Sequence, residues 1–548
     1  MARTLRGIIY PVLRLGGIIP LALLWLFPLV IGLMAVGTAG FDEASWRSLI
    51  LHPQFFPALS LSLATGALSL FISTLLAFWI VAGLYGSSLW KSIAALTGGF
   101  LSLPHLAFAI GFGFLIMPSG IFARVLGLIG GWSSPPQWVT TQDPFGVALT
   151  AALVLKEAPF IIWLIAALLA RPDVGEVLGK QFRASQSLGH GSASTWLRVF
   201  IPQILPRLRW PLIIVWVYGA SVVDMALAIG PTQPPPLAVI IWSDLNNVDQ
   251  IINARGTAGA VFLTFLLALL AILFHVVTGI FSRFTRGFLV RGPALWRGPH
   301  KSASLILVFL ATIYFLVLIV LCIMSAGSQW PYPNLWPTQF RLNAWAQLVS
   351  SPAPLAASLV LVLSGVAAAL VLAVLWFEAM HESLDRYLLV LAVAALAVPS
   401  LLIADGQYLA FLRLNLNGTW FGVFLSTLTP VFAYVFIVMK GPYRAFDPRY
   451  RSVSLGLNAS AWKFWLEVKL PLMKPVIAAA AAVGVGVSIA QYVPVQLIAS
   501  GRIATLTTDA VTLSSGGNRP LLAVYALLLA LIPLIGFLLA TRLGRRTA

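Results

Sequence analysis

Long apolar runs dominate this chain. A membrane-spanning helix needs about 20 mostly apolar residues, and runs of that length recur between charged residues, Pro and Gly clusters and polar loops. The stretch 121–131 is too short to span and is predicted to lie in the membrane interface. The first run is too long for a removable signal peptide and is interpreted as a retained helix. Twelve runs are predicted to span, with approximate bounds 15–37, 58–85, 92–117, 146–170, 211–230, 257–281, 303–326, 353–377, 387–409, 419–440, 476–499 and 521–541.

Composition and charge agree with an integral membrane protein. Of the 548 residues 60% are hydrophobic and 9% are charged, whereas soluble proteins carry about 25% charged residues. The net charge is +18. With the N-terminus placed in the cytoplasm, most Lys and Arg residues fall on cytoplasmic segments, as the positive-inside rule requires. The charge therefore indicates topology rather than nucleic-acid binding, and a single Cys322 excludes a disulfide framework and Cys-based metal sites.

The sequence contains an internal repeat. Ser187-Leu188-Gly189 recurs as Ser454-Leu455-Gly456, and the segment 219–224 recurs as 486–491 at the same offset in the numbering. Trp196 and Pro202 recur as Trp465 and Pro471, but at an offset larger by two, which places a short insertion in the second copy. We therefore predict two homologous halves of six spans each, in the same orientation. Their bounds are 1–285 and 303–548, with a cytoplasmic linker at 286–302.

The repeated segments occupy the longest cytoplasmic loop of each half, between its fourth and fifth spans. These loops, 171–210 and 441–475, are too polar to span and too apolar to be linkers. Each is predicted to form two short helices joined by a tight turn, at Gly189 and at Gly456, because Gly readily adopts the left-handed conformation. An amphipathic helix pair that merely lies on lipid is the simpler alternative.

The loops resemble a known family motif. Ser-Leu-Gly followed about a dozen residues later by Ile201-Pro202 or Leu470-Pro471 resembles the EAA loop of permease subunits of binding-protein-dependent ABC importers. The whole chain is most similar to the fused double permeases of the iron(III) and thiamine group. It departs from that pattern where Arg183-Ala184-Ser185 and Tyr450-Arg451-Ser452 replace the favoured Glu-Ala-Ala.

The resemblance implies an all-α membrane protein with the type I importer fold, in a bacterial inner membrane, with both termini cytoplasmic. It implies two separate ATPase subunits that hold ATP and Mg, a periplasmic or extracellular solute-binding protein, and surrounding lipid as partners. No cofactor, metal, catalytic residue or nucleic acid is expected on this chain. The residues expected to couple to the ATPases are Ala184, Ser187, Leu188, Gly189, Trp196, Pro202, Ser454, Leu455, Gly456, Trp462, Trp465 and Pro471.

Ionisable residues inside spans are costly and mark candidate pathways. Lys156 and Glu157 interrupt the fourth span and Asp224 the fifth, and Asp405 lies near the outer end of the ninth. Being adjacent on a helix, Lys156 and Glu157 are expected to meet partners on different neighbours. The repeat pairs Asp224 with Gln491. A buried structural network is an equally good interpretation. The candidate pathway residues are Lys156, Glu157, Ser221, Asp224, Ser488, Gln491 and Tyr492.

Other chemistries find little support in the sequence. The segment 175–180 lacks the spacing and hydroxyl of a phosphate-binding loop, so ATP hydrolysis is assigned to a separate subunit. The six His residues do not show metal-ligand spacing. Two alternatives remain: a secondary transporter of the major-facilitator kind driven by an ion gradient, and an intramembrane enzyme that acts on lipid through Lys156, Glu157 and Asp224. The sequence does not identify the solute.

Overall fold

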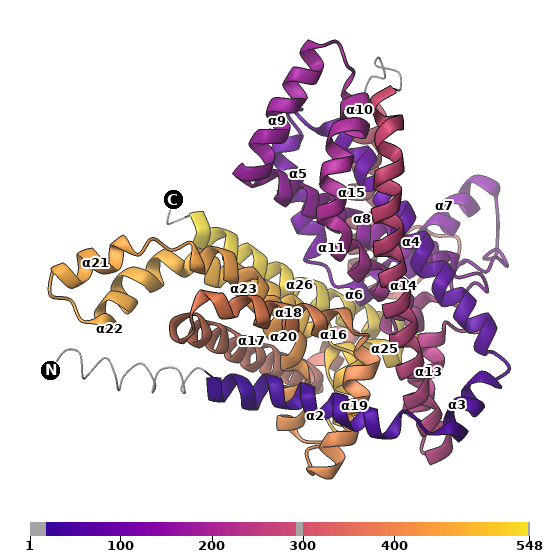
Figure 1. Cartoon of the computed structure of the whole chain (residues 1–548). Helices are drawn as coiled ribbons and strands as arrows, with labels where there is room; N and C mark the ends of the chain where they lie inside the picture. Colours follow the sequence, from indigo (N-terminus) through magenta and orange to yellow (C-terminus); the bar gives the residue numbers. More distant parts are fainter. Residues whose placement is uncertain (1–17, 292–299, 546–548) are drawn as a thin grey trace. The chain divides into compact units, whose positions relative to one another are not determined.

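The computed structural model describes residues 18–291 and 300–545 (Figure 1). In these ranges the regular structure is helical apart from two short antiparallel strands, β1 (Gly327–Gln329) and β2 (Gln339–Phe340). The predicted all-α membrane fold is therefore confirmed. Part of the predicted linker, 292–299, lies outside the described residues.

The helices divide the apolar runs differently from the prediction of twelve spans. Ten helices in the described ranges are long and apolar enough to cross a membrane, or eleven if one sharply bent pair counts as a single span. The ninth run is this bent pair, α18 (Asp385–Ala397) and α19 (Ser400–Arg413), which meet at 98° at Pro399. The third run is likewise broken at Pro104, between α5 (Trp90–Leu101) and α6 (His105–Ile116). Proline explains both breaks, because its ring excludes the preceding residue from the helical conformation.

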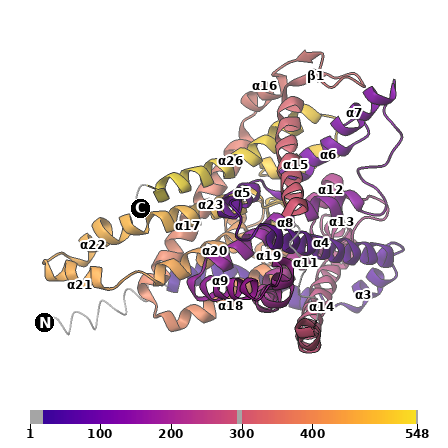
Figure 2. The ribbon, with the colours of Figure 1, turned by 90° about the horizontal axis from the view of Figure 1, so that it is seen from above.

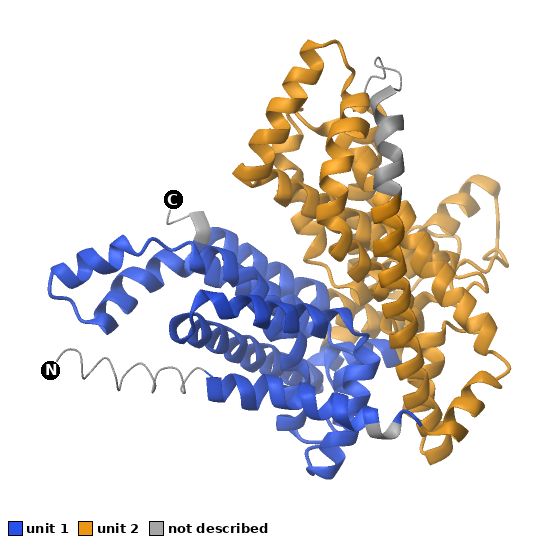
Figure 3. Ribbon diagram, viewed as in Figure 1, with its two compact units in different colours: residues 1–41, 346–512, 528–548 blue, residues 42–345, 513–527 orange. Residues whose placement is uncertain are grey.

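The chain forms two compact units, each assembled from segments that are separated in the sequence (Figure 3). Unit 1 comprises 1–41, 346–512 and 528–548, and unit 2 comprises 42–345 and 513–527. The helix of the first apolar run, α2 (Phe27–Ala39), thus belongs with elements of the predicted second half, and α15 (His300–Ala326) with elements of the first. The predicted halves describe the sequence repeat and remain a prediction.

In unit 2, α4 (Phe55–Leu84) is the central helix. It packs against α8 (Val147–Ala170), α11 (Ile201–Ser221) and α15. A Cβ on Gly111 of α6 would lie 2.7 Å from Val317 Cγ1, so the glycine permits the close approach of α15. The remaining helices of this unit are α3 (Glu43–Ile50), α7 (Ile121–Gly130), α9 (Pro172–Ser187), α10 (Ser192–Thr195), η2 (Trp196–Phe200), α12 (Asp224–Ile229), α13 (Leu237–Leu245) and α14 (Gln250–Arg291).

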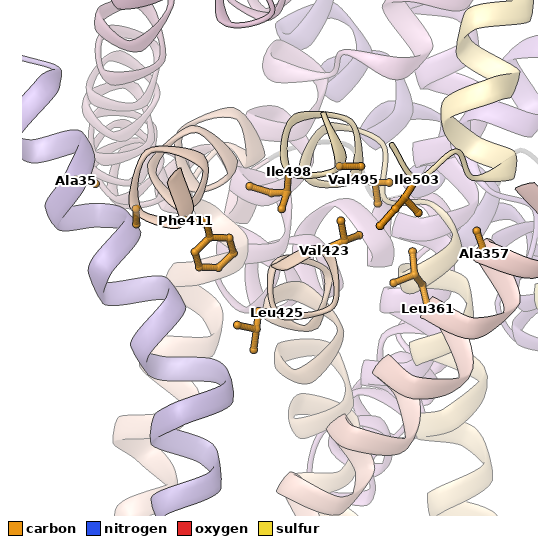
Figure 4. Packing of buried hydrophobic residues seen from close by; sticks show 11 residues of the cluster. Ala35, Ala357, Leu361, Phe411, Val423, Leu425, Val495, Ile498 and Ile503 are labelled. Carbon is orange, nitrogen blue, oxygen red and sulfur yellow. The ribbon is translucent and has the colours of Figure 1, made fainter. Parts of the chain in front are cut away.

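In unit 1, α20 (Trp420–Arg444) takes the central place, against α17 (Ala353–Ala379) and α23 (Leu470–Ile489). Figure 4 shows the apolar cluster that joins α2, α17, α19, α20 and α24 (Val493–Ala499), with Phe411, Val423 and Ile498 among its buried members. The remaining helices are η1 (Ala22–Leu26), η3 (Glu382–Leu384), α21 (Arg449–Gly456), α22 (Ala461–Phe464), η4 (Trp465–Lys469) and, crossing the unit boundaries, α16 (Asn343–Ser350), α25 (Leu506–Ser514) and α26 (Arg519–Arg545).

The two units repeat the same internal contacts. Ser62 Oγ of α4 accepts the backbone N–H of Leu237, and Ser358 Oγ of α17 accepts that of Leu506, both at 2.8 Å. Gly406 of α19 contacts α2 as Gly111 contacts α15, since a Cβ on Gly406 would lie 2.3 Å from the Gly32 carbonyl oxygen. The internal repeat predicted from sequence thus has a structural counterpart in packing.

The structure also corrects the register of the repeat. Gly189 has a φ of +83°, but Gly456 ends α21 with an ordinary backbone, and Asn458, with φ +63°, makes the left-handed turn instead. The prediction that Gly456 forms the turn is therefore wrong. Asn is one of the few residues with a side chain that tolerate this conformation. Gly189 and Asn458 have the same offset as Trp196 and Trp465, so the loops align without an insertion.

The same offset governs the helix that follows each loop. The break after α11 is followed by α12, which begins at Asp224, and the break after α23 is followed by α24, which begins at Val493. The structural counterpart of Asp224 is therefore Val493. The pairing of Asp224 with Gln491 came from a local similarity in sequence and is wrong.

Candidate functional site

Lys156 is held by the break between α5 and α6. Because Pro104 ends α5, carbonyl groups of its last turn lack partners within the helix. The Lys156 ammonium donates to Phe100 O of that turn at 3.1 Å and, just beyond the end of α5, to Leu103 O at 2.6 Å. Phe100 O also accepts the backbone N–H of Leu103 at 3.4 Å. Lys156 is fully buried, with the rings of Phe108 and Tyr314 within 6 Å of its nitrogen. These contacts favour the structural interpretation of Lys156, as a cap for α5.

Glu157 faces a different neighbour, as its position next to Lys156 requires. Its Oε1 lies 3.1 Å from Nε2 of His105, the first residue of α6. The Glu157 side chain is buried, whereas that of His105 is 35% exposed and packs against the Tyr218 ring. Sequence reasoning set His105 aside for want of a metal-ligand spacing. The position of His105 directly after Pro104, inside an apolar run, is the feature of the sequence that could have identified it.

Asp224 joins this group from another broken helix. It is the first residue of α12, just beyond the break that ends α11 at Ser221. Its carboxylate lies within electrostatic range of His105. Ser221 is buried and donates to Val217 O within its own helix. α12 packs against α6, so His105, Glu157 and Asp224, which we call the His105 cluster, lie in one region where two helices of unit 2 are interrupted.

The corresponding region of unit 1 is polar but differs in its charges. Gln407 of α19 donates to Thr429 Oγ1 at 3.1 Å and accepts from Ser426 Oγ at 2.7 Å. Asp405 is buried beside Gln407 in the same helix. Pro430 follows Thr429 as Pro159 follows Ala158, and this alignment places Thr427 and Leu428 at the positions of Lys156 and Glu157, between the two hydroxyl residues of the chain.

A small polar cavity of about 10 Å³ lies nearby in unit 1, which is room for about one water molecule. Ser488 and Gln491 line it. Ser488 Oγ is buried without a hydrogen-bond partner, while Gln491 Nε2 donates to Val487 O at 2.9 Å. Tyr492 precedes α24 and is mostly buried. The predicted pathway residues of this half therefore surround a helix break, as Asp224 does in unit 2. Thr427, Ser358 and Thr505 supply further polar lining.

The first loop buries its aromatic side chains against its own unit. Trp196 lies 1% exposed among the rings of Tyr85, Phe182 and Phe200, with centroid distances of 4.3–5.8 Å within the group. Burial raises the pKa of the Tyr85 phenol. Leu188, just before the left-handed turn, is 79% exposed. The loop therefore has an apolar anchor and an exposed apolar tip.

The second loop has the same helical path and a different anchor. In Figures 1 and 2, α21 and α22 form a hairpin at one end of unit 1. Trp462 is exposed and stacks on Trp465 at 5.9 Å. Leu457, at the position equivalent to Leu188, is 78% exposed. Within the loop an open groove of about 370 Å³ is lined by Asp447, Arg449, Tyr450, Val453, Ser454, Leu457 and Val468.

The other predicted coupling residues fall into two groups. Ala184, Ser187 and Leu455 are exposed, and Ser454 is buried. Pro202 and Pro471 stand in the first turns of α11 and α23, directly after the π-helical turns η2 and η4. The backbone is helical before and after each proline, so both lie inside continuous helices, just beyond the π-helical turns. In the described ranges no cluster of three or more His, Cys, Asp or Glu side chains could hold a metal ion.

Comparisons with known proteins find matches among membrane components of transport systems. Residues 362–548 match the family described as "Binding-protein-dependent transport system inner membrane component". The chain is 28% identical over 519 residues to the "Inner membrane ABC transporter permease protein YnjC" of Escherichia coli K12, and the match covers 94% of each chain. It is 26% identical over 266 residues to the "Putative 2-aminoethylphosphonate transport system permease protein PhnV" of Salmonella typhimurium LT2, which covers 46% of this chain and 98% of that protein.

Proposed function

We propose that this chain, a fused permease of an ABC importer, receives the movement of its ATPase partners through two loops, α9 to η2 and α21 to η4. A permease is a transport subunit and not an enzyme, and its family implies separate ATPase subunits. What supports the proposal for the loops is the repeated structure of their tips. Leu188 and Leu457 occupy equivalent positions, each just before the left-handed residue, and both are more than three-quarters exposed.

Exposed leucines at these two positions suit docking to another protein. An apolar side chain gains about 1.5–3 kcal/mol when it moves from water into a contact. Two equivalent leucines would suit two copies of one ATPase subunit. We further propose that a solute-binding protein docks on the opposite membrane face, and that both termini are cytoplasmic, as the distribution of Lys and Arg predicts.

The polar groups at the helix breaks are our candidates for contact with the solute. Discontinuous helices commonly form solute sites in transporters, and both the His105 cluster and the region of Ser488 and Gln491 lie at such breaks. Within the cluster the partly exposed His105 and Asp224 are the better candidates. Lys156 is assigned a structural role, because backbone carbonyls take up its ammonium group.

The test is a mild-detergent purification of the tagged chain from its native membranes, with mass spectrometry and an ATPase assay. The variants are Leu188→Asp, Leu457→Asp and both together. Val248→Asp is the matched control, since Val248 is 99% exposed but lies between α13 and α14, far along the chain from either loop.

We expect an ATPase to co-purify with the parent and with the control, to be reduced in each single variant, and to be lost in the double variant. Co-purification that survives the double change would show that the loop tips are not the docking surface. A parent that retains no ATPase even after crosslinking, and whose transport follows an ion gradient, would favour a secondary transporter.

A further inference from the structure

One carboxylate accepts hydrogen bonds from both the second loop and a membrane helix of unit 1. Glu378 lies in the last turn of α17, and its Oε1 accepts three hydrogen bonds. Lys469 Nζ donates at 2.6 Å, Tyr443 Oη at 2.5 Å and Trp465 Nε1 at 3.2 Å. Trp465 and Lys469 are the first and last residues of η4, and Tyr443 lies in the last turn of α20. One oxygen therefore connects the loop to two long helices.

The surroundings extend this connection into the helix bundle. The Lys469 ammonium also lies 4.5 Å from the centroid of the Tyr443 ring, so the cation is held between a carboxylate and an aromatic face. Beside it, Arg444 forms a bidentate pair with Asp385 and donates to the backbone carbonyls of Phe377 and Met380. The end of α20 is thus fixed to the ends of α17 and α18. Besides the continuous helix from η4 into α23, Glu378 therefore gives η4 a direct link to this assembly.

The first loop is anchored by different forces. In the corrected register the equivalents of Trp465 and Lys469 are Trp196 and Phe200, and neither of these carries a charge. Both belong to the aromatic group around Tyr85. Salt does not weaken apolar packing by screening, whereas it screens the pair of Lys469 and Glu378, whose side chains are 15% and 38% exposed. The two loops therefore follow the same backbone path but are anchored differently, the first by aromatic packing and the second by hydrogen bonds and an ion pair to Glu378.

We propose that Glu378 is a positioning residue, which transmits movement of the second loop to α17 and α20 when the ATPase partner closes. The inference rests on the proposed function of the loops. It separates transmission from docking: Glu378 lies at the inner end of the loop and Leu457 at its tip. Loss of the Glu378 charge leaves the docking surface in place and loosens the connection between the loop and the ends of α17 and α20.

The test uses the complex of the full chain with its ATPases in lipid nanodiscs. Nitroxide labels go on Ser452→Cys in α21 and Leu363→Cys in α17, in a Cys322→Ser background. Both labelled positions are exposed. Double electron–electron resonance then measures the distance between the two labels, in the state without nucleotide and in the state trapped by ATP and vanadate. The variants are Glu378→Gln, Lys469→Met and the conservative Lys469→Arg. Glu382→Gln, an exposed carboxylate of η3, is the matched control.

In the parent, in Lys469→Arg and in the control, we expect one narrow distance distribution that trapping leaves unchanged, because the loop and α17 move together. In Glu378→Gln and Lys469→Met the distribution should broaden and shift on trapping, while the amount of bound ATPase stays at the parent level. High salt should move the parent toward the Glu378→Gln result.

The outcomes distinguish the role of Glu378 from the proposed function of the loops. If the parent binds ATPase and Glu378→Gln keeps the narrow, unchanged distribution, the role of Glu378 is refuted and the proposed function stands. If Glu378→Gln loses the ATPase, Glu378 contributes to docking or folding and is not a transmission joint. If the parent itself binds no ATPase, the proposed function fails and the role of Glu378 fails with it.

Discussion

The two loop turns offer a sharp test, because sequence and structure assign different residues to the second one. Gly189 has a φ of +83°, so a Cβ there is strained although no atom lies within 4 Å of it. Gly189→Ala should cost about 1–2 kcal/mol, the usual penalty of the left-handed conformation. Gly456 is helical, with free space around its Cβ position. Gly456→Ala should therefore stabilise its loop by about 0.5–1 kcal/mol.

The two substitutions thus differ by roughly 1.5–3 kcal/mol in the free energy of local opening, on the order of 10- to 100-fold in the open population. Limited proteolysis of the chain in nanodiscs measures this, since Arg183 and Lys463 offer cleavage sites beside the turns. Asn458→Ala should accelerate cleavage of the second loop, and Gly456→Ala should slow it. If Gly456→Ala opens its loop as much as Gly189→Ala does, and Asn458→Ala has no effect, the register that pairs Gly189 with Asn458 is wrong.

Three further predictions concern stability, measured by thermal unfolding in detergent. Lys156→Met leaves the Leu103 carbonyl without its donor and Phe100 O with a single backbone donor, and it should destabilise unit 2 by about 1–3 kcal/mol. An equal or higher stability would show that the cap contributes nothing. Gly406→Leu should lower the stability, because its Cβ would meet the Gly32 carbonyl oxygen and force α2 away from α19. Gly37→Leu is the control and should leave the stability unchanged, since no atom lies within 4 Å of the Cβ position. Equal effects of the two substitutions would exclude close packing as the reason for Gly406. Asp385→Asn breaks the ion pair with Arg444, in which the aspartate is 2% exposed, and should cost about 3–5 kcal/mol of stability. Asp173→Asn is the control and should cost almost nothing, because the pair of Asp173 with Arg171 is exposed. The pKa of the Asp173 carboxyl is lowered mainly by that arginine.

Much of the fold could be predicted from the sequence because bilayer thickness fixes the length of an apolar run. Eight of the predicted runs, such as 58–85 and 353–377, appear as single long helices. Four runs differ, and two of them, the third and the ninth, contain a proline that explains the break. Pro104 and Pro399 lie inside apolar runs, and hydropathy does not register the backbone donor that proline lacks.

The candidate site could be predicted only in part. Lys156 and Glu157 stand out as charges in an apolar run, and the structure gives each the separate partner that helix geometry requires. The partners themselves depend on tertiary packing, since Phe100 and Leu103 contribute backbone oxygens that every residue has. The tripeptide Ser-Leu-Gly misled the alignment of the loops, because Asn458 performs the task of Gly189 without resembling it. Backbone conformation, and not residue identity, is what the two loops share.

The place of α2 in unit 1 has a consequence for synthesis. The indole N–H of Trp25 donates to the carbonyl of Thr429, 404 residues further along the chain. At a translation rate of about 5–20 residues per second, roughly 20–80 s separate the appearance of these two residues on the ribosome. During that interval the first helix resides in the bilayer with neither its hydrogen-bond acceptor nor the glycine surface of α19. A nascent chain stalled before residue 400 should therefore leave this helix accessible to crosslinking with lipid or with an insertion chaperone, and release of the stall should bury it.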